Sequence, residues 1–122
     1  MDDEDFIREI VTEILHYLGY EVESCADCRE AVARFRAAVE SNNPFSAVIL
    51  DLTIPGRMGG REAAALILEI DPAALLIVSS GYADDPVVAN FRQYGFSGVV
   101  SKPYDVNGLG RELERLICRR DD

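Results

Sequence analysis

The stretch SAVILDLTIPG, residues 46–56, joins an apolar run to an acidic side chain and then to a proline–glycine turn. An apolar run such as that over residues 47–52 is typical of a strand that is covered on both faces, as in a parallel sheet. A carboxylate at the end of such a strand loses hydration and needs a compensating partner. Asp51 is therefore either merely satisfied by a neighbour or used chemically.

Strand-like runs and helical patterns alternate outward from this stretch along the whole chain. Apolar residues at three- and four-residue steps, together with capping residues such as Asp27, predict the helices. We expect helices over residues 5–18, 27–39, 60–70, 86–94 and 106–118, and strands near Val22 and over residues 47–52, 74–78 and 98–103. Strands that alternate with helices imply right-handed crossovers and helices on both faces of a parallel sheet, which is an α/β doubly wound fold.

The first helix lacks the strand that this pattern requires ahead of it. The segment MDDE, residues 1–4, precedes the helix directly, although an acidic pair suits the loop after a strand. We therefore expect a truncated first strand, with two alternatives open: the residues continue a longer protein, or a neighbouring chain supplies the missing edge. In the second case the exposed edge would favour paired or swapped molecules.

Length and charge restrict the class of protein. The 122 residues fit one domain, 1–122, without repeats or linkers, and 22 acidic against 12 basic side chains give a net charge of -10. This charge would repel nucleic acid and anionic membranes. Because no apolar run approaches the roughly 20 residues that span a bilayer, and the acidic amino terminus is unlike a secretory signal, we expect a cytoplasmic chain.

The three cysteines give only weak support for a metal or redox site. Cys25, Cys28 and Cys118 form an odd set, and the first two have the spacing of a redox motif or of half a zinc site. No second ligand pair follows, and the single histidine, His16, lies on a helical pattern. We therefore favour reduced thiols near the surface or the edge of the core over a metal or redox site.

Polar residues follow the expected strands at the edge where an open parallel sheet binds its ligands. These residues are Asp2, Asp3, Asp51, Ser79 or Ser80, and Lys102. Carboxylates that converge repel one another, and a raised pKa or a cation relieves the repulsion. Oxygen ligands favour Mg2+, for which the carboxylates and the backbone carbonyl of Thr53 form a plausible partial shell. Lys102 adds a positive charge and Ser79 a hydroxyl donor, a set suited to phosphoryl transfer onto Asp51.

The segments MDDE, VILDLTIPG, IVSSGY and VVSKPY, in this order and spacing, resemble the receiver domains of bacterial two-component response regulators. The resemblance covers the chain except for the missing first strand, and implies a flavodoxin-like fold with strand order 2-1-3-4-5. It implies Asp51 as phosphoacceptor, Asp2 and Asp3 as the acidic pair for Mg2+ with Asp3 the more direct ligand, Ser79 as the switch hydroxyl, Lys102 as the family lysine, and a cis bond between Lys102 and Pro103.

Two positions depart from the family pattern. Val99 stands where the family commonly has an aromatic switch residue, and Cys28 stands where glycine is frequent. The style of residues 77–104 resembles receivers attached to hybrid sensor histidine kinases.

The resemblance implies a signalling module that takes a phosphoryl group from a phosphohistidine onto Asp51 and changes its surface between Ser79 and Tyr104. The expected partner is a sensor histidine kinase or a histidine phosphotransfer protein, and a homodimer through the last strand and helix or the sheet edge stays open. Enzymatic activity is expected only as self-phosphotransfer and autodephosphorylation.

Two other classes compete with this interpretation. One is a degenerate receiver that acts only as a protein-interaction module. The other is a hydrolase of the haloacid-dehalogenase type, which usually carries a second Asp where this chain has Thr53. A flavin-binding function has still less support, because no loop rich in Ser, Thr and Gly follows an early strand.

Overall fold

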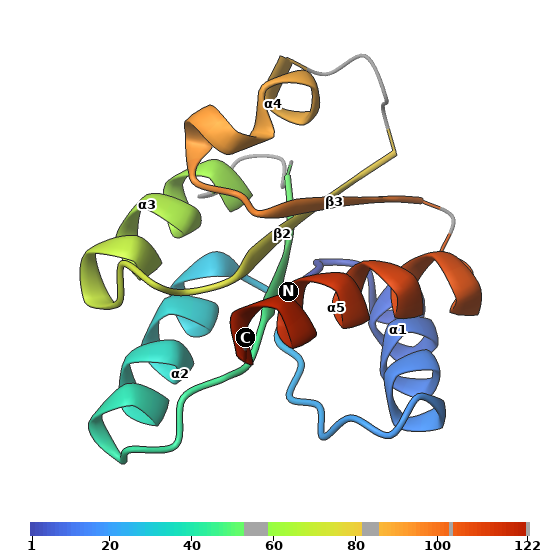
Figure 1. The fold of residues 1–122 in the computed structure, drawn as a ribbon, viewed down its shortest axis with the longest axis horizontal. Coiled ribbons are helices and arrows are strands. Elements are labelled where there is room, and N and C mark those ends of the chain that lie inside the picture. The colour runs from blue at the N-terminus through green and yellow to red at the C-terminus, as the bar shows by residue number, and fades with distance from the viewer. Residues whose placement is uncertain (53–58, 82–85, 103, 122) are drawn as a thin grey trace.

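A parallel three-stranded sheet lies at the centre of the structure. The computed structural model describes residues 1–52, 59–81, 86–102 and 104–121. The strands are β1 (Val48–Asp51), β2 (Leu76–Ser80) and β3 (Gly98–Ser101), and the sheet has the order β1-β2-β3 (Figure 1). The strand predicted over residues 47–52 is confirmed over Val48–Asp51, and the one predicted over residues 98–103 is confirmed over Gly98–Ser101. The one predicted over residues 74–78 lies two residues further along the chain. Pro103, with its predicted cis bond, lies outside the described residues.

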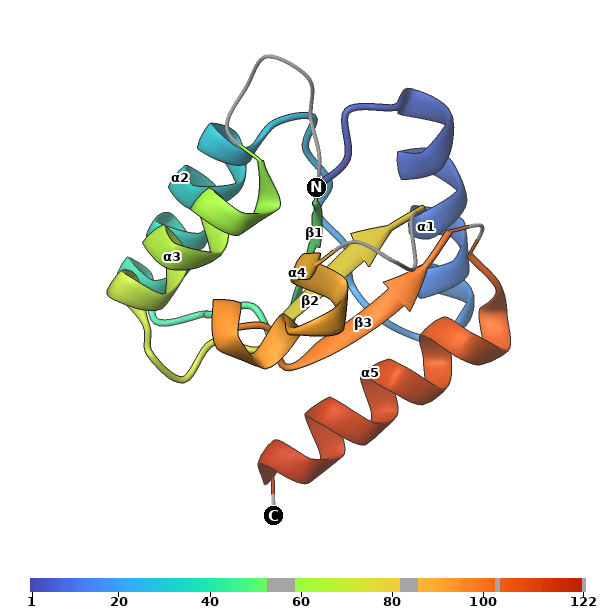
Figure 2. The same ribbon diagram turned by 90° about the horizontal axis from the view of Figure 1, so that it is seen from above.

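Helices cover both faces of this sheet, as the doubly wound prediction requires. In Figure 2, α2 (Cys28–Glu40) and α3 (Gly60–Ile70) lie on one side of the sheet, and α1 (Asp5–Tyr17) and α5 (Val106–Asp121) lie on the other. A cap places the start of α2, because the Asp27 side chain accepts a hydrogen bond of 2.8 Å from the Glu30 amide.

The alternation of side chains along β2 divides the apolar interior into two cores. The first core lies under α2 and α3 and has as members Phe35, Leu50, Ile67, Leu76 and Val78. The second lies under α1 and α5 and joins Ile77 and Val100 to Leu109, Leu113 and Leu116. Because successive residues of β2 face opposite ways, this one strand contributes to both cores.

The strand predicted near Val22 is wrong as a sheet element. Residues 20–26 run as an irregular segment between α1 and α2 and form no strand, so the first two strands of the expected order are not present as strands in the described part of the chain. A strand needs a partner for its backbone, and residues 21–24 have no neighbouring strand to pair with. Met1 and Asp2 alone lie between this segment and β1.

Two further predictions need correction. The helix predicted over residues 86–94 is a short turn of helix, α4 (Pro86–Ala89), followed by a 3-10 helix, η1 (Phe91–Tyr94), which ends at Gly95 with φ +91°. Phe6, which the periodicity assigns to the inner face of α1, is 70% exposed. Among the described residues, no helix has both the length and the apolar character needed to cross a membrane.

Candidate functional site

The sheet register brings three of the predicted residues to one edge. Asp51 is the last residue of β1 and lies beside Ser79 of β2, so both side chains point to the same face. Lys102 follows β3 directly, and its amide donates to the Ser80 carbonyl at 3.0 Å. The structure thus assembles residues that lie far apart in the sequence, as predicted from their positions after the strands.

The Asp51 carboxylate is buried next to the Lys102 ammonium. Asp51 is 6% exposed, and the Lys102 Nζ atom lies 3.4 Å from its Oδ1 atom and 2.8 Å from the Asp2 Oδ2 atom. Burial raises the pKa of Asp51, the charge of Asp2 raises it further, and Lys102 opposes both effects. Asp2 and Asp51 therefore share the ammonium of Lys102, whose single positive charge does not balance the two carboxylates.

Lys102 stays charged in this site despite partial burial. Burial acts to lower the pKa of Lys102, but the hydrogen bond to Asp2 and the negative charge of Asp51 raise it above the usual value. The ammonium is therefore available as a fixed positive charge at neutral pH.

Asp2 is held in place by its backbone as well as by Lys102. Its amide donates to the Cys25 carbonyl at 3.2 Å, and its carbonyl accepts from the Arg8 guanidinium at 2.7 Å. Its Oδ1 atom accepts from the Glu4 amide at 2.9 Å. The Oδ2 atom is buried and, apart from the ion pair with Lys102, has no regular hydrogen-bond partner among the described residues.

Met1 extends this network to the end of β1. The Asp51 amide donates to the Met1 carbonyl at 3.0 Å, and the Met1 ammonium donates to the Ile49 carbonyl at 2.7 Å. Burial lowers the pKa of this ammonium, partly offset by the charges of Cys25 and Asp2. The charges of Asp2 and Asp51 both act on this ammonium, so it belongs to the same electrostatic network.

The acidic residues at this edge fit a hard cation. Side-chain oxygens of Asp2, Asp3 and Glu4 lie within 4.8 Å of one another, with Asp2 buried and the other two exposed. This all-oxygen set suits Mg2+, and so does the raised pKa of Asp51, which indicates that the site is short of positive charge despite Lys102. The predicted ligand at Thr53 lies outside the described residues.

Ser79, the predicted switch hydroxyl, is fully buried and bonded to a residue that the sequence did not single out for this contact. Its Oγ atom shares a short hydrogen bond with the Tyr104 hydroxyl. Burial raises the pKa of Tyr104, so the hydroxyl stays protonated. Ser80 is also buried but lies beside Ser101 rather than beside Asp51.

The cysteines near the site have the character of inert thiols. Burial raises the pKa of Cys28 to about 12 and also raises that of Cys25. The Cys28 Sγ atom lies 3.9 Å from the Met1 Sδ atom, and the Cys25 Sγ atom donates to the Asp27 carbonyl at 3.6 Å. Because the thiolate is the reactive form, these surroundings favour structural thiols over a redox or metal site.

Comparison with known proteins gives one consistent family. The sequence profile of the response regulator receiver domain matches residues 1–114. Chemotaxis protein CheY of Thermotoga maritima is 29% identical over 117 residues, which cover 95% of this chain and 92% of CheY. The transcriptional regulatory protein DctD of Rhizobium meliloti is 28% identical over 98% of the chain, and ethylene receptor 2 of Oryza sativa subsp. japonica is 29% identical over 96%. The chain spans only 25% and 15% of the length of these last two proteins.

Solved structures agree with this result. CheY4 of Vibrio cholerae has a TM-score of 0.80 at 27% identity, covering 94% of this chain and 92% of that one. The CheX-CheY-BeF3-Mg+2 complex from Borrelia burgdorferi has a TM-score of 0.82 at 26% identity, covering 93% and 83%. With the sheet, its helices and the acidic edge in place, the chain belongs to the family of response regulator receiver domains of two-component signalling.

Proposed function

We propose that residues 1–122 form a phosphoacceptor receiver domain that takes a phosphoryl group from a phosphohistidine onto Asp51. One observation carries this proposal: the Asp51 carboxylate is buried at the end of β1 with the Lys102 ammonium 3.4 Å away. A carboxylate held rigidly beside a positive charge can attack phosphorus while the charge on the transferred group is compensated.

The reaction transfers one phosphoryl group from the imidazole of the phosphohistidine to the carboxylate of Asp51. An Asp51 Oδ atom forms a bond to phosphorus, the bond from phosphorus to the imidazole nitrogen breaks, and its electron pair stays on that nitrogen. Lys102 remains protonated throughout and pairs with the oxygens of the transferred group. Ser79 is placed to donate its hydroxyl to one of these oxygens once it leaves Tyr104. Beyond this self-phosphotransfer and the later autodephosphorylation, we assign no turnover.

We assign Mg2+ to the same edge, held by Asp2, Asp3, Asp51 and the Thr53 carbonyl. When bound, the cation neutralises charge on the carboxylates and on the phosphoryl oxygens. Both Mg2+ and BeF3 are named with the CheY of Borrelia burgdorferi in its complex with CheX, which supports Mg2+ as the cation for this chain. The exposed Asp3 is accessible to an ion from solvent, whereas Asp2 is engaged with Lys102.

The expected donor is a sensor histidine kinase or a histidine phosphotransfer protein in the cytoplasm, not nucleic acid or a membrane. Membership of the receiver family supports the class of partner, and the net charge of -10 argues against a polyanion. We expect the partner to detect the change through β3 and α5, the elements that carry Lys102 and Tyr104 to the site.

The test is the intact mass of the chain after incubation with acetyl phosphate, with Mg2+ or with EDTA. We expect one phosphoryl adduct that requires Mg2+ and is absent from Asp51→Asn. The matched control is Asp5→Asn, an exposed carboxylate on α1 that should leave the adduct unchanged. A folded parent chain without an adduct would contradict the proposal and leave the interaction-only receiver as the alternative.

A further inference from the structure

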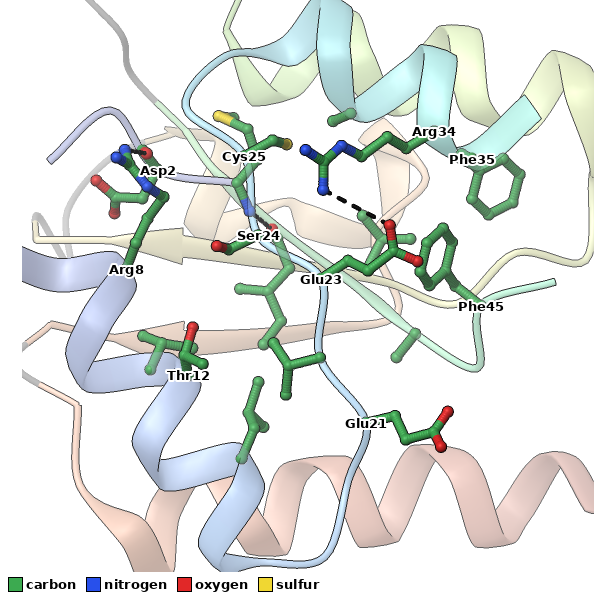
Figure 3. Close-up of a pocket in the computed structure, with 18 of the residues that line it drawn as sticks. Asp2, Arg8, Thr12, Glu21, Glu23, Ser24, Cys25, Arg34, Phe35 and Phe45 are labelled. Carbon is green, nitrogen blue, oxygen red and sulfur yellow. Dashed lines mark hydrogen bonds and ion pairs between the residues drawn. The ribbon is translucent and has the colours of Figure 1, made fainter. Parts of the chain in front are cut away.

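The Arg8 side chain reaches from α1 to the acidic residues at the edge of the sheet. Its Nη1 atom donates to the Asp2 carbonyl at 2.7 Å, and its Nη2 atom pairs with the Asp5 carboxylate. Figure 3 shows Arg8 beside Asp2 among the residues that line a cavity of about 150 Å³. The Arg8 side chain is 20% exposed, so most of it is packed against protein. The phosphoryl transfer proposed above does not use this arginine.

The contact with the Asp2 carbonyl is the better protected of these two contacts. The Asp5 carboxylate is 86% exposed, and an exposed ion pair on one helix stabilises little because water and salt screen it. The hydrogen bond to the Asp2 carbonyl is partly buried. A hydrogen bond from a charged donor is stronger than one between neutral groups. Arg8 therefore acts chiefly on the backbone at Asp2.

This hydrogen bond fixes one of the two peptide groups that flank Asp3. The Asp2 carbonyl belongs to the peptide group before Asp3. The Glu4 amide belongs to the peptide group after Asp3 and donates to the Asp2 Oδ1 atom at 2.9 Å. Because each peptide group is planar, fixing the planes on both sides of a residue fixes its φ and ψ angles. The exposed Asp3 side chain therefore leaves the backbone in a fixed direction.

The charge of Arg8 has the opposite effect on a cation at this edge. A guanidinium repels Mg2+, and the neighbouring Asp5 carboxylate offsets part of that repulsion. Positioning of the acidic residues and repulsion of the cation therefore predict opposite changes in Mg2+ affinity when Arg8 is replaced by an uncharged residue.

We propose, on the basis of the Mg2+ site proposed above, that Arg8 is a positioning residue for that site. By holding the Asp2 carbonyl, it keeps the Asp3 carboxylate ordered before the cation arrives. A ligand that is already ordered loses less conformational entropy on binding. Residues that orient metal ligands in this way typically contribute roughly tenfold to hundredfold in metal affinity. This role adds α1 to the elements that build the site.

The experiment measures Mg2+ binding to the unphosphorylated chain by isothermal titration calorimetry, with magnesium chloride as the titrant. We expect Arg8→Met to weaken the affinity by at least roughly tenfold, although this change removes a positive charge. The matched control is Arg36→Met, which removes the same charge from an exposed position on α2. Salt screens a charge at that position, so the control should stay within about twofold of the parent affinity.

A conservative variant separates the donor from the charge. Arg8→Lys keeps the positive charge and one donor but loses the planar fork that contacts Asp2 and Asp5 together. Its Mg2+ affinity should lie between those of the parent chain and Arg8→Met.

Two further measurements distinguish positioning from general loss of structure. Arg8→Met should raise the Mg2+ concentration that gives half the maximal rate of adduct formation, and should leave the rate at saturating Mg2+ within about twofold of the parent rate. In EDTA, hydrogen exchange of the Glu4 amide should become roughly fivefold faster in Arg8→Met, the equivalent of about one net hydrogen bond.

The possible failures are distinguishable from one another. An Mg2+ affinity that is unchanged or tighter in Arg8→Met would overturn the role of Arg8 and leave the proposed function standing. An equal loss of affinity in Arg36→Met would assign the effect to net charge and overturn the role as well. A folded parent chain that takes up no Mg2+ would overturn the proposed metal site, and the role of Arg8 with it.

Discussion

The hydrogen bond between Ser79 and Tyr104 occupies the hydroxyl that the proposed phosphoryl group needs. Ser79 lies in register with Asp51 and is fully buried, so it reaches that group only after parting from Tyr104. With Val99 at the position that is commonly aromatic, Tyr104 is the aromatic residue that contacts this hydroxyl in the described part of the chain.

Tyr104→Phe should therefore speed phosphorylation by acetyl phosphate by roughly threefold to tenfold, the equivalent of one net hydrogen bond. The rate of adduct formation by intact mass measures this effect. Tyr17→Phe, on a side chain that is 80% exposed, is the control. Equal rates for the two variants would show that the Ser79 contact does not limit the reaction.

Asp51 also makes stability depend on pH. Its pKa is raised above 3.8 by burial and by Asp2, so the folded chain holds this proton more tightly than the unfolded chain. As pH rises from 3.8 through the raised value, the unfolded state has fewer bound protons than the folded state, and the fold loses stability. At pH values above the raised pKa of Asp51, the loss of folding stability no longer changes with pH.

Asp51→Asn should be more stable than the parent at pH 7, and the difference should shrink as the pH falls toward 4. Urea unfolding in EDTA at both pH values measures it, with Asp5→Asn as the control for an exposed carboxylate. A difference that did not change with pH would rule out relief of the Asp51 charge as its cause.

The residues of the candidate site could be predicted because strand ends in a parallel sheet converge, and Asp51, Ser79 and Lys102 follow from that rule. The partner of Ser79 could not be predicted in the same way. Tyr104 lies beyond the last strand, where the chain has no fixed period, and its contact depends on how the segment after Lys102 folds.

At the scale of elements, the close approach of α3 to β1 supports Asp51 from behind its backbone. A Cβ atom at Gly60, the first residue of α3, would lie 2.5 Å from the Asp51 carbonyl oxygen. Only a residue without a side chain lets the helix begin there without moving the strand end.

Gly60→Ala should cost roughly 1–3 kcal/mol of unfolding free energy, the range for overpacking, and should slow phosphorylation because Asp51 moves. Gly81→Ala is the matched control, because a Cβ atom there meets nothing within 4 Å. Urea unfolding and adduct formation measure both effects. If the two variants lost equal stability, the cause would be general rather than the contact with Asp51.

The predicted helices are right where the pattern depends on residues that are close in the sequence. The prediction near Val22 is wrong because a strand also needs a neighbouring strand that is distant in the sequence. The capping signal at Asp27 and the apolar faces of α2 and α3 depend on neighbouring residues in the chain, and the structure has them. The strand predicted near Val22 needed a neighbouring strand to pair with, and the periodicity of residues 20–26 carries no information on whether such a neighbour is present. At Asn90 the helical pattern changes to a 3-10 helix, whose end is fixed by a backbone hydrogen bond of 3.0 Å from the Phe96 amide to the Phe91 carbonyl.

At the scale of the whole molecule, stability depends on the two cores more than on the exposed apolar residues. Phe35 is 2% exposed and stacks on Phe45 at a ring distance of 6.5 Å, whereas Phe6 projects from α1 into solvent. Composition alone counts both as apolar material for a core, and only the fold distinguishes them.

Phe35→Ala should lower the free energy of unfolding by roughly 3–5 kcal/mol, the range for a deleted buried aromatic side chain. Phe6→Ala should change it by less than about 0.5 kcal/mol. Thermal and urea unfolding with circular dichroism measure both variants. A large loss from Phe6→Ala would indicate that α1 packs in solution in a way that this structure does not show.

The division of the interior by β2 has a consequence for how such a domain can diversify. The helices beside Asp51 rest on the first core, whereas α5 rests on the second, so the two sets of side chains meet only across the sheet. Changes in separated groups combine additively. Grafting the α5 of another receiver, together with the apolar residues beneath it, should therefore exchange the surface that α5 presents and leave Asp51 and the helices α2 and α3 undisturbed.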